Sequence, residues 1–256
     1  MRLLILLFLS FFSIVLHAQK VDLTEEEIKW IEENPTVNFA FAPEWKPFEI
    51  VNNGSYTGIS NEFLQIISKK TGLKFRGVEY EKWSDCLSAV KSKRVQLIPC
   101  LFKTPEREAF LNFTKVYAEC PAVIATKRDY PYVQNLEFFK GKKLAMARSY
   151  SNTEFIEKNF PGIEIVYVDN SREAIELVSM GKVDGTVDHL PVISYYIYYE
   201  GFQNLKVAAP SKKYNTDEIH MAVNKENKIL LSILNKAISE IYPQQKNEVF
   251  GKWVAV

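Results

Sequence analysis

Arg107 is the residue of this chain whose type and position point most directly to anion binding. It ends the segment Thr104-Pro105-Glu106-Arg107, in which Thr104 can cap a helix and Pro105 suits its first position. The dipole at a helix start favours anions, so it does not explain a cation there. A bidentate grip on a ligand carboxylate is one explanation. A salt bridge with Glu106 or Glu108 is the alternative.

Two further segments offer polar groups where α/β sheets place ligands. Ser149-Tyr150-Ser151 follows a strand pattern and precedes a helical one, so its hydroxyls and N–H groups are expected at a helix N-terminus, where anions bind. Plain helix capping explains the same residues. Asp188 lies just past another predicted strand, at the edge where open α/β sheets bind ligands. Capping of the following helix is its alternative.

The N-terminal residues have the pattern of a signal peptide. Arg2 supplies a positive start, an apolar run extends from Leu3 to Leu16, and Ala18 offers a small residue for cleavage. The run is shorter than the roughly 20 residues of a spanning helix. We therefore expect residues 1–18 to be removed near Ala18 and the protein to reach the periplasm. An uncleaved anchor is the alternative.

Composition limits the classes of partner. The whole chain has 32 basic and 31 acidic residues, and Arg2 lies in the segment expected to be removed, so the mature chain is formally neutral. Such a balance gives no electrostatic reason to expect nucleic acid as a partner. An apolar fraction of 47% is typical of a globular protein with a sizeable core. We expect a monomer.

The cysteines and histidines give no sign of a metal or a cofactor. Cys86, Cys100 and Cys120 are an odd number in an exported chain, which is not a disulfide framework. Cys100 and Cys120 can pair if their strands lie side by side; otherwise all three are small buried residues. His189 and His220 alone remain after processing, so no metal site and no cofactor are expected. We interpret His189 as a surface or capping neighbour of Asp188.

Helical and strand patterns alternate along the whole chain, which predicts an α/β fold with largely parallel sheets. A capping box of Thr24 and Glu27 opens a helix that reaches Glu33, and Ser60 is expected to cap another that Gly72 ends. Strands are expected at 37–41, 73–79, 95–99, 122–125, 143–147, 163–168 and 183–187, and further helices around Leu87, up to Lys158, over 190–200 and over 226–242.

Three segments, in this order, resemble the family 3 periplasmic solute-binding proteins. They are Trp45 to Glu49 with Gly54 to Gly58, then Thr104 to Arg107 with Tyr117, then Gly181 to Gly185 with Asp188. The opening helix and the stretch from Leu97 to Arg107 are most similar to the Venus-flytrap branch associated with sensor kinases.

The resemblance implies a two-lobed periplasmic binding protein type II fold with two hinge strands. Lobe 1 would comprise residues 21–125 plus 209–256, and lobe 2 residues 126–208. The ligand, an amino acid or related carboxylate, would lie between them. The resemblance implies that Trp45 packs on the ligand and that Asp188 meets its ammonium. The full set of expected ligand contacts is Trp45, Phe102, Thr104, Arg107, Tyr150, Ser151 and Asp188.

The chain departs from the family pattern in two places. The acidic residue that often precedes the first aromatic is missing from Phe41-Ala42-Pro43, which disfavours a cationic ligand unless Glu44 turns inward. Cys100 and Phe102 stand where the pattern often has serines, which weakens the case for binding an amino group. A carboxylate without a conventional α-amine therefore remains open.

The sequence is compatible with three functions. The first is a binding protein that presents its solute to a membrane permease. The second is an input module for a separate sensor kinase. The third is an enzyme similar to cyclohexadienyl dehydratases, which needs a general acid in the cleft. Since no glutamate stands out for that role, we expect no enzymatic activity and no catalytic residue.

Overall fold

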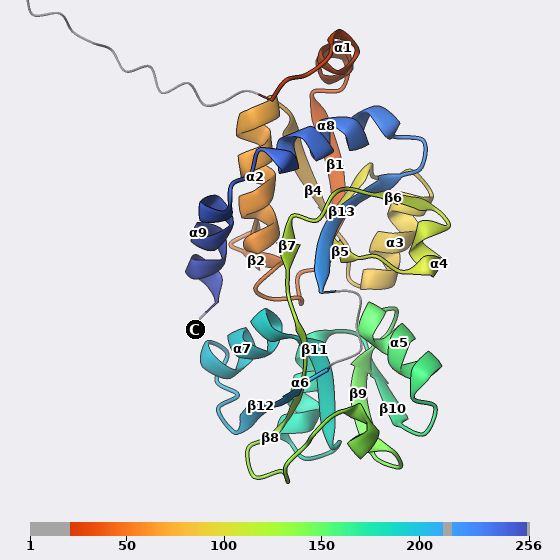
Figure 1. Ribbon diagram of the computed structural model, residues 1–256, viewed down its shortest axis with the longest axis vertical. Coiled ribbons are helices and arrows are strands. Elements are labelled where there is room, and N and C mark those ends of the chain that lie inside the picture. Colours follow the sequence, from red (N-terminus) through yellow and green to blue (C-terminus); the bar gives the residue numbers. More distant parts are fainter. Residues whose placement is uncertain (1–20, 212–216, 255–256) are drawn as a thin grey trace, which may run out of the picture.

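The computed structural model describes residues 21–211 and 217–254, and the expected signal peptide, residues 1–18, lies outside them. The chain forms two α/β lobes, one above the other in Figure 1, each built on its own sheet. We call them the first and second lobe. Within the described ranges no helix combines the length and the apolar character needed to cross a bilayer.

The first lobe holds a mixed sheet. Its strands, in spatial order, are β4 (Lys74–Glu79), β1 (Thr36–Phe41), β5 (Leu97–Phe102), β13 (Glu218–Asn224) and β6 (Leu111–Phe113), with β7 (Ala118–Glu119) also paired to β13. The strands β4, β1 and β5 are parallel, whereas β13 is antiparallel to β5 and β6. A hairpin of β2 (Ile50–Asn52) and β3 (Ser55–Thr57) lies beside this sheet.

The second lobe holds a five-stranded sheet. Its spatial order is β10 (Glu164–Val168), β9 (Lys143–Ala147), β11 (Gly185–His189), β8 (Ala122–Lys127) and β12 (Leu205–Pro210). The strands β10, β9 and β11 are parallel, and β8 runs antiparallel to both of its neighbours. In each sheet, therefore, one strand that leads between the lobes runs against the parallel ones: β13 in the first sheet and β8 in the second.

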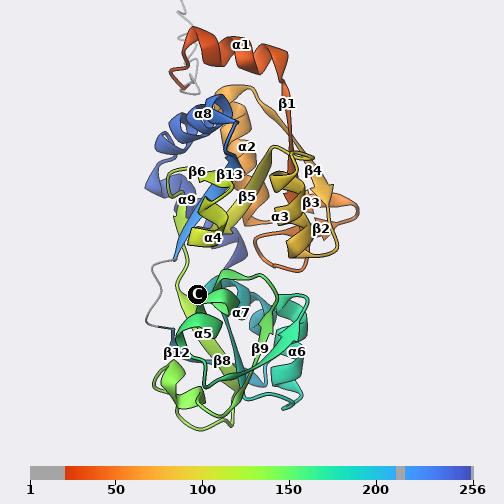
Figure 2. The same cartoon turned by 90° about the vertical axis from the view of Figure 1, so that its right-hand side faces the viewer.

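Helices cover the faces of both sheets (Figures 1 and 2). The first lobe has α1 (Glu25–Glu33), α2 (Ile59–Thr71), α3 (Trp83–Lys91), α4 (Pro105–Glu108), α8 (Lys228–Ser239) and α9 (Pro243–Trp253). The second has the short 3-10 helix η1 (Leu136–Phe139), α5 (Ser151–Asn159), α6 (Ser171–Ser179) and α7 (Leu190–Tyr198).

The fully buried strand β5 shows why helices must cover both faces of the first sheet. Leu97 belongs to the apolar cluster that includes Phe63 and Leu64 of α2, whereas Ile98 packs in the cluster of Cys86 on α3. Neighbouring residues of a strand point to opposite faces, so a run that is apolar throughout needs a cover on each side.

Most local predictions are confirmed. The capping box of Thr24 and Glu27 starts α1, and Gly72 ends α2 with a left-handed φ of 82°. The expected cap at Ser60 is wrong, because α2 begins at Ile59, so that its N-cap is Gly58 and Ser60 lies inside the helix. The terminal helix ends at Ser239, and a separate helix, α9, follows. The cysteines are free and buried, as in the second of the two alternatives.

Two stretches connect the lobes. The chain passes from β7 in the first sheet to β8 in the second, and β12 of the second sheet precedes β13 of the first. We keep the lobe ranges 21–125 plus 209–256 and 126–208 as a proposal. The strand β8 extends across the boundary at residue 125, and both of its partner strands, β11 and β12, belong to the second sheet.

Candidate functional site

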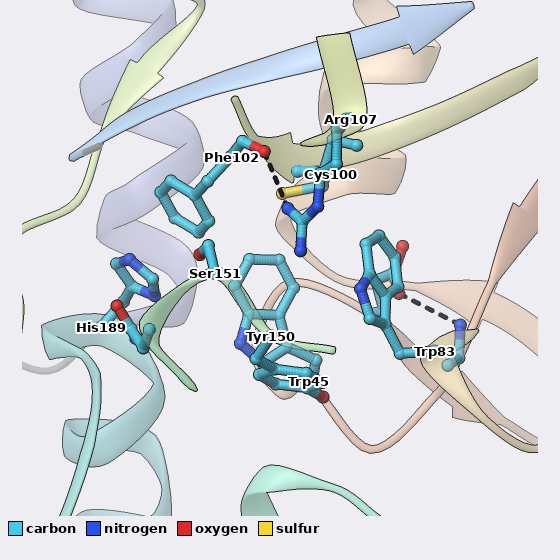
Figure 3. A pocket seen from close by; sticks show the side chains of 12 residues that line it. Trp45, Trp83, Cys100, Phe102, Arg107, Tyr150, Ser151 and His189 are labelled. Atoms are coloured by element: carbon cyan, nitrogen blue, oxygen red, sulfur yellow. Dashed lines mark hydrogen bonds between the residues drawn. The ribbon is translucent and has the colours of Figure 1, made fainter. Parts of the chain in front are cut away.

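A cavity lies between the two lobes, at the level where the strands of both sheets end (Figure 3). Four aromatic side chains form much of its wall: Trp45, Trp83, Phe102 and Tyr150. The polar side chains that line it are Glu49 and Arg107 from the first lobe, and Ser151, Asn152 and His189 from the second. The cavity volume is about 30 Å³, which gives room for about two ordered waters. An amino acid would therefore need the side chains or the lobes to move.

Arg107 joins the two lobes at this cavity. Its side chain is buried, and Thr104 caps the helix in which it lies by accepting a hydrogen bond from the Arg107 backbone N–H. Its Nη1 donates to the Phe102 carbonyl at 2.7 Å, and its Nη2 donates to the Ser149 carbonyl of the second lobe at 2.9 Å. The carboxylate that pairs with it, at 4.0 Å, belongs to Glu154. Of the two expected alternatives, Glu108 pairs instead with Lys103.

The Ser149 carbonyl is held in position by the backbone and by two donors. Ser149 has a φ of 60°, a left-handed conformation that costs a serine about 1–2 kcal/mol. Its carbonyl accepts hydrogen bonds from Arg107 Nη2 and from Trp83 Nε1, the latter at 3.1 Å. Each η nitrogen of Arg107 carries two N–H donors, so a carboxylate that engaged both nitrogens could share Nη2 with this carbonyl.

Asp188 lies behind the cavity wall and is surrounded by donors. Its Oδ1 accepts hydrogen bonds from Trp45 Nε1 at 3.4 Å and from the His189 backbone N–H at 2.7 Å. Its Oδ2 accepts one from the Ser171 hydroxyl. The side chain is buried, and it is His189 that lines the cavity at this point.

His189 occupies a different place from the one the sequence predicts. It is the N-cap residue of α7, but its side chain makes no capping bond, and it is only 2% exposed. Its ring stacks on that of Phe102 from the first lobe, with centroids 3.8 Å apart and planes 7° apart. The expectation of a surface residue is therefore wrong, because the opposite lobe covers this strand end.

Five of the seven expected contact residues line the cavity: Trp45, Phe102, Arg107, Tyr150 and Ser151. Thr104 and Asp188 support it from behind. The sequence analysis missed Glu49, Trp83, Asn152 and His189 as lining residues. Glu49 ends the first segment that resembles the family, Asn152 directly follows Ser151, and His189 directly follows Asp188. A prediction that included the sequence neighbours of the expected contact residues would have contained Asn152 and His189. The ligand contacts themselves remain predictions.

Glu49 is a carboxyl group enclosed by the cavity wall. It is 1% exposed, and its Oε2 accepts a hydrogen bond from the Ala42 N–H at 3.2 Å. The Tyr56 hydroxyl lies 3.5 Å from its Oε1. Burial raises the pKa of the Glu49 carboxyl to about 8, against an ordinary value of 4.5. The group therefore keeps its proton at neutral pH.

Replacing Glu49 by glutamine should remove a pH dependence of stability. Between about pH 4.5 and pH 8 the folded protein holds a proton on Glu49 that the unfolded chain has lost. The free energy of unfolding of the wild type should therefore fall as pH rises through this window. Glutamine does not titrate, and it can still accept the Ala42 hydrogen bond. Urea unfolding of both proteins at pH 5 and pH 8 measures the effect. If the free energy of unfolding changes between these pH values by the same amount in the wild type and in Glu49→Gln, the prediction is wrong.

Comparisons with known proteins agree with this architecture. The family model for bacterial extracellular solute-binding proteins, family 3, matches residues 37–256. The chain is 26% identical over 230 residues to the virulence sensor protein BvgS of Bordetella pertussis, which covers 89% of this chain and 18% of that protein. It is 25% identical over 211 residues to the ABC transporter arginine-binding protein 1 of Escherichia coli, which covers 80% of this chain and 84% of that protein.

A solved structure supports the same family and fold. The crystal structure of the periplasmic VFT2 domain of B. pertussis BvgS superposes with a TM-score of 0.82 at 25% identity, covering 91% of this chain and 99% of that one. The resemblance to sensor-associated flytraps is thus confirmed, and so is the two-lobed type II fold. The chain spans about a fifth of the length of the curated relatives that it matches first.

Proposed function

The chain belongs to family 3 of the bacterial extracellular solute-binding proteins, and we propose that it binds a small polar solute between its lobes. We propose an amino acid or a related carboxylate as the ligand. The observation that carries this proposal is the buried guanidinium of Arg107 in an aromatic cavity between the lobes. A guanidinium in such a place favours a planar anion, which it binds through two parallel hydrogen bonds.

Closure of the lobes is the proposed mechanism. A solute would first dock on the first lobe through Arg107 and Trp45, and the second lobe would then close with Ser151. Direct contacts between the lobes favour the closed form, among them the ion pairs Lys46–Glu200 and Lys82–Asp169, both at 3.0 Å. A ligand shifts the balance between open and closed forms only by its differential affinity for them.

We propose that a membrane protein recognises the closed form. The relatives support two candidates, since one is named as part of an ABC transporter and another as a sensor protein. The similarity to the BvgS domain favours a sensor kinase over a permease. A binding role agrees better with these relatives than an enzymatic one. We further propose a periplasmic location, with residues 1–18 cleaved as a signal peptide, and a monomer.

A thermal-shift screen of the purified protein against amino acids, small carboxylates, amines and sugars tests this function. A ligand at about 100 times its dissociation constant stabilises the folded state by about 2.7 kcal/mol, a shift of a few degrees for a chain of this size. We expect amino acids or carboxylates to raise the melting temperature. If sugars or amines alone do so, the assignment of a carboxylate site is wrong.

A further inference from the structure

His189 lines the cavity between the lobes and carries a polar atom without a partner among the described residues. The residue is 2% exposed and lines the cavity, beside Phe102 in Figure 3. Its Nε2 is buried and has no hydrogen-bond partner among the described residues. A buried polar atom without a partner destabilises the folded state, so such atoms in native proteins call for an explanation. A ligand atom that fills the cavity is the explanation that this position favours.

The neighbours of His189 decide what its Nε2 can do. Its Nδ1 lies 3.3 Å from Asp188 Oδ1, a carboxylate oxygen that also accepts hydrogen bonds from Trp45 Nε1 and the His189 N–H. Since a carboxylate only accepts, we assign the ring the tautomer with its proton on Nδ1, which lets Nδ1 donate to Asp188. The Nε2 atom is then a hydrogen-bond acceptor. Stacking on Phe102 holds the ring in this orientation.

A second buried acceptor belongs to the same lobe. Asn152 lies in the first turn of α5, is 2% exposed and lines the cavity. Its Oδ1 also lacks a hydrogen-bond partner among the residues that the structure describes. Two residues of the second lobe that line the cavity therefore each carry a buried acceptor without a partner in the described part of the chain, while the first lobe contributes the guanidinium of Arg107 and the carboxyl group of Glu49. A solute that satisfies both sides carries a carboxylate and, close to it, an N–H or O–H donor.

We propose that His189 contacts the ligand directly and selects solutes that carry an amine or hydroxyl donor beside the carboxylate. This inference rests on the proposed function and narrows its ligand class to α-amino and α-hydroxy acids. The family resemblance assigns the contact with the ligand amine to Asp188, and we assign it to His189 instead. Asp188 is already engaged by Trp45, Ser171 and the His189 backbone.

Two substitutions separate contact with the ligand from support of Asp188. In His189→Asn the shorter amide can still donate to Asp188, in place of Nδ1, but nothing remains at the position of Nε2. In His189→Gln the amide reaches the position of Nε2. We expect His189→Asn to bind donor-bearing solutes about 10- to 100-fold more weakly, because their donor is left unpaired in a buried site. His189→Gln should retain more of the affinity. If His189 only supports Asp188, this order is reversed.

The probes are two matched series of solutes measured by isothermal titration calorimetry. L-alanine, L-lactate and propionate share three carbons, and L-glutamate, 2-hydroxyglutarate and glutarate share five; the last member of each lacks the donor. The wild type should prefer the first two members of a series, and His189→Asn should lose that preference. His220→Asn is the matched control, since His220 is buried against Thr114 in the first sheet, outside the cavity lining. It should keep the preference.

Each remaining result decides against the inference. If the wild type binds all members of a series equally, or if His189→Asn keeps the preference, His189 does not select the ligand, although the carboxylate site stands. If no member binds the wild type, the proposed function fails and the inference fails with it.

Discussion

Replacing Arg107 by alanine should weaken the binding of any carboxylate ligand by about 100-fold or more, because the ligand anion would be buried without its cation. The substitution also removes the Arg107 donor to the Phe102 carbonyl, so the free energy of unfolding should fall as well, by about 1–3 kcal/mol, whereas the Ser149 carbonyl keeps its hydrogen bond from Trp83 Nε1. Calorimetric titration with the ligand found in the screen measures the first effect, and urea unfolding measures the second.

Two further variants separate charge from geometry at this position. Arg107→Lys keeps the charge but loses the bidentate fork, so binding should recover only in part. Arg148→Ala removes an arginine that is exposed and lies over Tyr167 in the second lobe, and it should bind like the wild type. Carboxylate affinity that is equal in Arg107→Ala and Arg148→Ala would exclude Arg107 as the anchor.

Replacing Gly58 by alanine should destabilise the first lobe by about 2–4 kcal/mol. Gly58 has a φ of 107° and a ψ of −178°, a conformation essentially restricted to glycine. A Cβ atom there would lie 2.6 Å from the Phe48 carbonyl oxygen and 2.7 Å from that of Pro47. The same two carbonyls accept hydrogen bonds from the first N–H groups of α2, so this contact fixes the segment that carries Trp45 and Glu49.

Gly251 provides the matched control for this glycine. It lies in α9, and a Cβ atom there would meet nothing within 4 Å. Gly251→Ala should therefore stabilise the protein slightly, by about 0.4–1 kcal/mol. Urea unfolding of both variants measures the difference. If Gly58→Ala unfolds at the same urea concentration as Gly251→Ala, the close approach at Gly58 is not a structural requirement.

The elements that depend on local chemistry could be predicted from the sequence. The capping box at Thr24, the left-handed end of α2 at Gly72 and the cap at Thr104 are each determined within a few residues, and each is confirmed. The seven expected strands are confirmed for the same reason, with ends that differ by a few residues, but β12 and β13 were not predicted. The strand β5 extends to Phe102, three residues beyond the expected end at Pro99, because Ile219 and His220 of β13 pair with it there. Those partners lie far away in the sequence.

The environment of the site could not be predicted in the same way. A histidine after Asp188 is as compatible with solvent as with a cavity, and only the packing of the second lobe against Phe102 decides between them. The same holds for Arg107, whose partners at Ser149 and Glu154 are more than 40 residues away and belong to the other lobe. The residues of the site can be identified from local motifs, but their partners depend on how the lobes meet.

The most direct test of the central claim is a crystal structure of the protein with the carboxylate or amino acid that stabilises it best in the screen. We predict the ligand between the lobes, with its carboxylate on the η nitrogens of Arg107 and with Trp45 packed against it. A ligand bound outside this cavity, or inside it with no contact to Arg107, would contradict the proposed function.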